Sequence, residues 1–224
     1  MSAPPVLVFD LDGTLVDTAP DLFTALNVVL ADAGHAPVEA EIARTMVGRG
    51  ARMMITRAFA ARGAAIEGAA LDRANERFLA VYEGCIADGS RAFPGVEPAL
   101  DRFAAAGYRL AVCTNKYERL SKLLLEALGL SGRFAAIAGQ ETFGVCKPHP
   151  DHILKTVAAA GGDPATAIMV GDSVTDVDAA RAAKVPIVGV TFGYTDVPMQ
   201  ALSPDVAIDH FDALWDAVAG LGRR

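Results

Sequence analysis

Short runs of consecutive apolar residues recur along the chain and predict its buried strands. Continuous apolarity, in place of strict alternation, is typical of strands that are covered on both faces. The predicted strands are Val6–Phe9, Leu110–Cys113, Ala135–Ala138, Ala167–Val170, Ile187–Val190 and the weaker run Val206–Ile208.

Helical patterns separate these runs over most of the chain. Four such segments are 97–107, 117–129, 151–161 and 176–184, and the second places leucines on one stripe before it ends at Gly129. Strands that alternate with helices predict an α/β fold with a doubly wound, Rossmann-like parallel sheet.

The first two strands are separated by about a hundred residues, far more than the dozen or so that a βαβ crossover needs. The surplus is helical in pattern: one segment starts at Thr18, a candidate N-cap, and ends at Gly34. We therefore predict a catalytic core formed by residues 1–16 and 89–224. An all-helical cap, residues 17–88, is inserted after the first strand, where it could close over a site.

Composition narrows the classes of partner. The chain is 224 residues long and 52% hydrophobic, as expected of a well-filled core, and its formal net charge is −7. A broad attraction to nucleic acid or anionic lipid is therefore not expected. No apolar stretch is long enough to span a bilayer, and the opening "MSAPP" does not resemble a secretory signal. Three widely spaced cysteines form no C-x-x-C pair, so we expect a cytoplasmic protein.

Polar side chains follow the predicted strands, at the edge of the sheet where open parallel sheets bind ligands. Carboxylates follow the first and fourth strands, a hydroxyl and an amide follow the second, and a lysine lies in the loop after the third. These residues are Asp10, Asp12, Thr114, Asn115, Lys147, Asp172 and Asp176.

Grouping three carboxylates without a cation would be costly, because like charges about 5 Å apart repel by roughly 3 kcal/mol at an effective dielectric constant of 20. Mg²⁺ is usually held by one or two carboxylates together with waters and substrate phosphate. Asp10, Asp172 and Asp176 therefore predict a Mg²⁺ site, and Lys147 would meet the charge of a phosphate ester.

Each of these residues also has an ordinary structural interpretation. Asp10, Thr114 and Asp176 could be helix caps or surface groups, and taken singly that interpretation is favoured. The functional interpretation depends on their occurrence, in order, after successive strands. In the sequence "VFDLDGT", Gly13 permits a tight turn, and Leu11 can point into the core while its neighbours point outward.

The sequence resembles the haloacid dehalogenase superfamily, and within it the phosphatases that carry a helical cap. "DLDGTLVDT", "CTNK", "CKPHP" and "GDSVTDVDAA" are similar to the four motifs of that family, and the likeness spans nearly the whole chain. "DTAPDL", "TNK", "FPGV" and "GVTFGYTD" are similar to the bacterial subgroup that hydrolyses 2-phosphoglycolate.

The resemblance implies a reaction with a carboxylate nucleophile. Asp10 would attack phosphorus and form an aspartyl-phosphate, and Asp12 would protonate the leaving alkoxide and then activate water. Thr114 and Asn115 would bind the substrate, and Lys147 would stabilise the transferring group. Phosphoryl transfer depends mainly on positioning and charge neutralisation, which suits this set.

The resemblance also implies the ligands of Mg²⁺. Asp10, Asp172 and the main-chain carbonyl of Asp12 would bind the ion, with Asp176 in or just outside its first shell. Thr175 stands where relatives often carry asparagine. This departure is expected to change hydrogen bonds around the ion and not the reaction.

Several rival activities are disfavoured by the sequence. Dehalogenating relatives lack an acid at the position of Asp12, and phosphonate-cleaving relatives use a cap lysine, whereas residues 17–88 contain no lysine. Mutases usually carry a basic residue soon after the first motif, and here none occurs before Gly34. A non-catalytic phosphate-binding protein stays possible, but the complete set of acidic and basic groups argues against it. A receiver-type signalling domain would not need the large insert.

The substrate is expected to be a small phosphorylated metabolite, with 2-phosphoglycolate first and pyrophosphate or a sugar phosphate as alternatives. In the cap sequence "VGRGAR", Arg49 is either a solvated turn residue or the group that meets the substrate carboxylate. Arg52 is a second candidate for that role. The sequence is compatible with a monomer or a homodimer.

Overall fold

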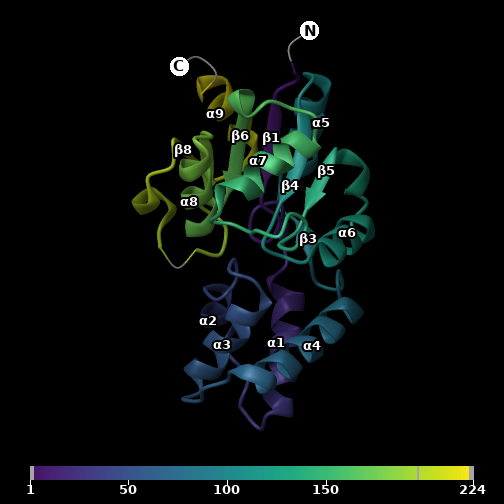
Figure 1. Cartoon of the computed structure of the whole chain (residues 1–224), viewed down its shortest axis with the longest axis vertical. Helices are drawn as coiled ribbons and strands as arrows, with labels where there is room; N and C mark the ends of the chain where they lie inside the picture. Colours follow the sequence, from purple (N-terminus) through teal and green to yellow (C-terminus); the bar gives the residue numbers. More distant parts are fainter. Residues whose placement is uncertain (1–2, 196, 222–224) are drawn as a thin grey trace.

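The computed structural model describes residues 3–195 and 197–221 and has two lobes (Figure 1). One lobe holds a parallel sheet with its surrounding helices. The other is built from helices α1 (Ala19–Asp32), α2 (Ala40–Arg44), α3 (Ala51–Ala61) and α4 (Gly68–Gly84). The described part of the chain begins and ends in the sheet lobe, on the side away from these four helices, so the helical lobe is an excursion of the chain.

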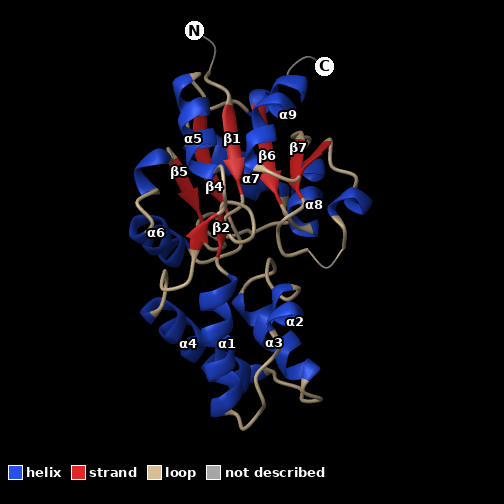
Figure 2. Ribbon diagram, turned by 180° about the vertical axis from the view of Figure 1, so that it is seen from behind, coloured by secondary structure: helices blue, strands red, loops and turns tan. Residues whose placement is uncertain are grey.

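The main sheet has six parallel strands in the order β5-β4-β1-β6-β7-β8. The chain runs outward from β1 to β4 and β5, then returns to the opposite side of β1 for β6. The sheet is therefore doubly wound, and its carboxyl edge faces the helical lobe (Figure 2). The bounds are β1 (Val6–Phe9), β4 (Arg109–Cys113), β5 (Ala136–Ala138), β6 (Ala167–Gly171), β7 (Ile187–Val190) and β8 (Val206–Ile208).

This architecture confirms the α/β fold class predicted from the apolar runs. The strand ends agree to within one residue: β4 begins one residue earlier than predicted, β5 one residue later, and β6 ends one residue later. Continuous apolarity arose because alternate residues of one strand enter two separate cores. Leu7 and Phe9 face one core, while Val6 and Val8 face the other.

The remaining helices cover the two faces of the sheet. Side chains of α5 (Val96–Ala105), α6 (Glu118–Ala127) and α9 (Leu214–Leu221) fill one core. Those of α7 (Pro150–Ala159) and α8 (Val174–Ala183) fill the other. Short 3₁₀ turns lie at Ser131–Arg133, Pro164–Thr166, Met199–Leu202 and Phe211–Ala213.

A two-stranded antiparallel ribbon, β2 (Val16–Asp17) and β3 (Arg91–Ala92), joins the lobes and was not predicted. Each strand has only two residues, too few to produce a readable alternation. The chain leaves the sheet lobe through β2 and returns through β3. The carboxylate of Asp21 accepts hydrogen bonds from the backbone N–H groups of Gly89 and Ser90, both at 2.8 Å, which ties the outgoing helix to the returning chain.

The cap has a hydrophobic core of its own, to which α1, α2, α3 and α4 contribute, and which Leu120 of α6 joins. Thr18 occupies the N-cap position of α1, but its side chain makes no capping hydrogen bond. Within the described ranges, no helix combines the length and apolarity needed to cross a membrane.

Candidate active site

The candidate site lies at the carboxyl end of β1, between β4 and β6, where the winding of the sheet reverses direction. This reversal is where open α/β sheets bind ligands. The turn after β1 is tight: Gly13 has φ +82°, and a Cβ there would lie 2.4 Å from Oδ2 of Asp172. Glycine is therefore required both by the backbone conformation and by the close approach of the turn to Asp172. Leu11 is fully buried in the core, as the sequence predicted.

Three buried carboxylates meet at this edge, and one buried ammonium lies among them. Asp10, Asp172 and Asp176 each offer an oxygen, and these oxygens all lie within 4.8 Å of one another. Lys147 Nζ contacts Oδ1 of Asp10 at 2.8 Å and Oδ1 of Asp176 at 2.6 Å. Three carboxylates thus face one ammonium, and all four groups are buried.

The protonation equilibria of these groups reflect that imbalance. Burial raises the pKa of Asp10 above its ordinary value, Lys147 opposes the shift, and Asp176 adds to it. Burial likewise raises the pKa of Asp172, and the charges of Asp176 and Asp10 add to the effect. Burial alone would lower the pKa of Lys147, but attraction to Asp10 and Asp176 outweighs it and raises that pKa.

Neighbouring groups hold the carboxylates in place. Asp172 accepts a hydrogen bond from the Thr14 hydroxyl at 3.1 Å and one from the backbone N–H of Tyr194 at 2.7 Å. Oδ2 of Asp176 accepts from the backbone N–H of Ser173 at 3.0 Å, which caps α8, while its other oxygen accepts from Lys147. Asp176 is therefore both a helix-capping residue and a member of the site.

The chemistry of this donor set fits a hard divalent cation. Oxygen ligands from buried carboxylates suit Mg²⁺, and a cation would offset the burial and the mutual repulsion that raise the pKa values of Asp10 and Asp172. Asp10, Asp172 and Asp176 are thus the residues that could hold the ion, in keeping with the set proposed from the sequence.

Asp12 lies apart from this cluster and has a different partner. Lys116 Nζ donates to both carboxylate oxygens of Asp12, at 2.8 and 3.1 Å. The ammonium also lies 4.4 Å from the ring centroid of Tyr82 of the cap helix α4. The sequence placed Lys116 after the second strand but assigned it no role. A lysine adjoining Thr114 and Asn115 was the only signal available.

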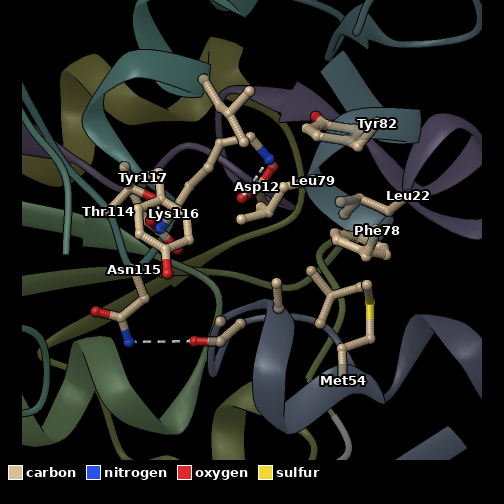
Figure 3. Close-up of a pocket in the computed structure, with 16 residues that line it drawn as sticks. Asp12, Leu22, Met54, Phe78, Leu79, Tyr82, Thr114, Asn115, Lys116 and Tyr117 are labelled. Carbon is tan, nitrogen blue, oxygen red and sulfur yellow. Dashed lines mark hydrogen bonds and ion pairs between the residues drawn. The ribbon is translucent and has the colours of Figure 1, made fainter. Parts of the chain in front are cut away.

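A cavity opens between the two lobes at this point (Figure 3). Its volume is about 40 Å³, room for roughly three water molecules. One wall comes from the core and includes Lys116, and the facing wall comes from the cap and is mostly apolar. The lining residues are Asp10, Asp12, Leu22, Val47, Gly48, Gly50, Ala51, Met54, Phe78, Leu79, Tyr82, Thr114, Asn115, Lys116, Tyr117 and Leu120.

Thr114 and Asn115, predicted to bind the substrate, both line this cavity. The hydroxyl of Thr114 accepts a hydrogen bond from the backbone N–H of Lys116 at 3.2 Å. The Asn115 amide donates to the carbonyl of Lys147 at 3.0 Å and to that of Gly48 in the cap at 3.4 Å. Asn115 therefore links the loop that carries Lys147 to the cap.

Comparison with known proteins places this geometry in a family. The sequence profile of haloacid dehalogenase-like hydrolases matches residues 4–184. The chain belongs to this hydrolase family. Its relatives include phosphoglycolate phosphatases of Mesorhizobium japonicum, 52% identical over 94% of this chain and 92% of that one, and of Agrobacterium fabrum, 53% identical over 96% and 92%.

A solved structure agrees with these sequence relatives. A protein from Haemophilus somnus, described as a predicted phosphoglycolate phosphatase, superimposes with a TM-score of 0.89 at 30% identity, covering 97% of this chain and 99% of that one. Together these relatives place this haloacid dehalogenase-like hydrolase among the phosphatases, which confirms the resemblance and the enzyme class predicted from the sequence.

The two cap arginines that the sequence offered for the substrate carboxylate lie outside this cavity. Arg49 is exposed and lines a separate small pocket that borders Ser173 and Thr175. Arg52 pairs with Asp72 at 2.7 Å on the surface, where both side chains are at least half exposed. Neither arginine lines the cavity beside Asp10 and Asp12.

Thr175 occupies the position at which the sequence departs from the usual family pattern. Its hydroxyl lies 2.8 Å from the Ser173 hydroxyl and reaches the carbonyl of Gly48 at 3.4 Å. The side chain therefore contacts the capping residue of α8 and the cap loop.

Proposed function

We propose that this chain is a Mg²⁺-dependent phosphomonoester hydrolase that works through an aspartyl-phosphate on Asp10. The observation that carries the proposal is the division of two neighbouring carboxylates between different environments. Asp10 lies buried against Lys147 in the acidic cluster, and Asp12 lies at the cavity against Lys116. Two carboxylates with separate surroundings suit a nucleophile and an acid–base group.

The reaction proceeds in two steps. An Asp10 oxygen attacks phosphorus, the bond from phosphorus to the ester oxygen breaks, and Asp12 gives that oxygen a proton. Asp12 then takes a proton from water as the water attacks phosphorus, which releases inorganic phosphate and restores Asp10. Lys147 neutralises charge on Asp10 and on the transferring group, and Thr114 offers its hydroxyl to the phosphoryl oxygens.

Asp10 and Asp172 would hold the Mg²⁺ ion together with the Asp12 carbonyl, and Asp176 lies close enough to join them or to orient them through Lys147. When bound, the ion supplies positive charge that offsets the carboxylates and the phosphoryl oxygens.

We propose 2-phosphoglycolate as the substrate, with glycolate and phosphate as products. The names of the bacterial relatives support this choice. The protein would meet this metabolite in the cytoplasm, as a monomer or a homodimer.

Initial rates on a substrate panel test the proposal. The full chain is assayed with Mg²⁺ on 2-phosphoglycolate, pyrophosphate, glucose 6-phosphate and an aryl phosphate, and again with excess EDTA. We expect the highest kcat/KM for 2-phosphoglycolate and no turnover in EDTA. The Asp10→Asn variant should fold normally and lose at least about 10³-fold in rate, because it lacks the nucleophile. Wild-type turnover by that variant would refute the covalent mechanism, and a better rate on a sugar phosphate would refute the substrate.

A further inference from the structure

Lys116, Asp12 and Tyr82 form a cluster that joins the catalytic turn to the cap. The side chains of Lys116 and Asp12 are only 6% and 12% exposed. Lys116 comes from the loop after β4, Asp12 from the turn after β1, and Tyr82 from the cap helix α4. Figure 3 shows the ammonium between the Asp12 carboxylate and the Tyr82 ring.

The ion pair is at odds with the task of Asp12. An acid that protonates a leaving group must face that group, whereas both carboxylate oxygens of Asp12 are held by the Lys116 ammonium, at 2.8 and 3.1 Å. Asp12 can therefore turn to the ester oxygen of a substrate only if Lys116 gives up a contact with it.

A second anion can release Asp12 by taking its place beside the Lys116 ammonium. In 2-phosphoglycolate one methylene group separates the ester oxygen from the carboxylate. Asp12 must come within hydrogen-bond reach of that ester oxygen in order to protonate it. The substrate carboxylate then lies beside Asp12, and so beside the ammonium that Asp12 contacts. Of the described residues that line the cavity, Lys116 is the only one with a positive charge.

We propose that Lys116 is the residue that recognises the substrate carboxylate, and that it exchanges Asp12 for this group when the substrate binds. The proposal rests on the proposed function and adds its specificity-determining residue. A substrate with a carboxylate takes the ammonium from Asp12 and leaves the Asp12 oxygens free to face the ester oxygen. A phosphate ester without a carboxylate makes no ion pair with Lys116, and Lys116 then stays paired with Asp12.

The surroundings of Lys116 strengthen such an exchange. The cap supplies Phe78, Met54 and the Tyr82 ring to the cavity, and these apolar groups limit the water that would otherwise solvate a carboxylate. A charge-assisted hydrogen bond is stronger in such surroundings than at an exposed surface. Arg49, by contrast, is solvent-exposed and lines a different pocket.

The test compares a carboxylate substrate with its neutral isostere. Wild type, Lys116→Met and Lys116→Arg are assayed with Mg²⁺ on 2-phosphoglycolate and on its primary amide, in which the carboxylate is replaced by CONH₂. Lys116→Met should lower the kcat/KM ratio of acid to amide at least tenfold, equal to about 1.4 kcal/mol. Lys116→Arg should restore part of that ratio. Lys122→Met removes an exposed lysine of α6, and Arg49→Met removes the cap arginine that lies outside the cavity. Both variants should keep the wild-type ratio.

Binding without turnover gives an independent readout. The non-hydrolysable 3-phosphonopropionate and the uncharged-tail propylphosphonate are titrated calorimetrically into wild type and Lys116→Arg, and into Lys116→Met if it folds. Wild type should prefer the carboxylate compound at least tenfold. Lys116→Met should abolish that preference.

The outcomes separate this inference from the proposed function. If Lys116→Met lowers both rates equally, or if Arg49→Met alone removes the preference, the assignment of Lys116 is overturned while the phosphatase function stands. If wild type hydrolyses the amide as well as the acid, both the substrate and the role of Lys116 are wrong. If wild type hydrolyses no phosphate ester with Mg²⁺, the proposed function itself fails.

Discussion

Replacement of Lys147 by methionine tests whether one ammonium holds the acidic cluster together. Lys147 is almost fully buried, and its Nζ contacts Asp10 at 2.8 Å and Asp176 at 2.6 Å. The hydrocarbon part of the side chain is retained in Lys147→Met, so the principal loss is the positive charge. Removing one partner of a buried ion pair usually costs about 3–5 kcal/mol, because the remaining charge stays buried without compensation.

Lys155→Met provides the matched control. Lys155 pairs with Asp151 at 3.6 Å on the surface of α7, and about half of each side chain is exposed. An exposed pair of this kind is worth about 0.3–0.5 kcal/mol. The two variants therefore remove the same chemical group in two environments, and the expected costs differ by about tenfold.

The assay is equilibrium urea unfolding in EDTA, supported by thermal unfolding. For a chain of this size, 1 kcal/mol shifts Tm by about 2–4 °C, so Lys147→Met should lower it by roughly 6–20 °C. Lys155→Met should lower Tm by no more than about 2 °C. Mg²⁺ should restore part of the stability of Lys147→Met, because it neutralises the same carboxylates. A Lys147→Met variant as stable as the control would show that the carboxylates are not held as charged groups around this lysine.

Three further changes test other parts of the structure. Gly13→Ala should lower the free energy of unfolding by at least about 1 kcal/mol and weaken Mg²⁺ binding measured by calorimetry, since the added Cβ would meet Asp172 at a residue with positive φ. The control is Gly34→Ala, where φ is +77° and nothing lies within 4 Å of the added Cβ. It should cost only the backbone strain and leave Mg²⁺ binding unchanged. His152 is buried, and burial, aided by the charge of Lys147, lowers its pKa from 6.5 to about 4. Between these values the unfolded chain binds more protons, so stability falls as pH drops through this window; His152→Gln should abolish roughly 2 kcal/mol of the loss from pH 7 to 5 in urea titrations. Asp21→Ala should cost roughly 3 kcal/mol by the same assay, because it leaves the N–H groups of Gly89 and Ser90 and the Ser90 hydroxyl without their acceptor. An unchanged urea midpoint in Gly13→Ala or Asp21→Ala, or an unchanged pH dependence in His152→Gln, would contradict the contact concerned.

The strands were readable from the sequence because burial on both faces leaves an unbroken apolar run. The order of the strands in the sheet was not readable in the same way. A parallel sheet with β1 at its centre follows from pairing between residues that are far apart in the chain, such as Val6 with Arg109 and with Ala167. The ribbon of β2 and β3 was missed because two-residue strands carry no periodicity.

The acidic cluster was predictable because each of its members follows a strand. Strand ends of a parallel sheet share one edge, so Asp10, Asp172 and Asp176 converge once the strands are identified. Next to this cluster, His149 caps α7 by accepting a hydrogen bond from the backbone N–H of Asp151, and His152 is buried.

The sequence by itself determined which carboxylates and which lysine meet at the edge of the sheet, and the tertiary structure decided which cation lines the cavity. Residue types and their spacing from strand ends were enough to bring Asp10, Asp172, Asp176 and Lys147 together. They offered Arg49 and Arg52 for the substrate carboxylate and passed over Lys116, because the lining of the cavity depends on how the cap lies against the core. That placement leaves Arg49 exposed to solvent and puts Lys116 against both Asp12 and Tyr82. Lys116, Asp12 and Tyr82 lie far apart in the sequence, so no local sequence pattern could predict that they meet.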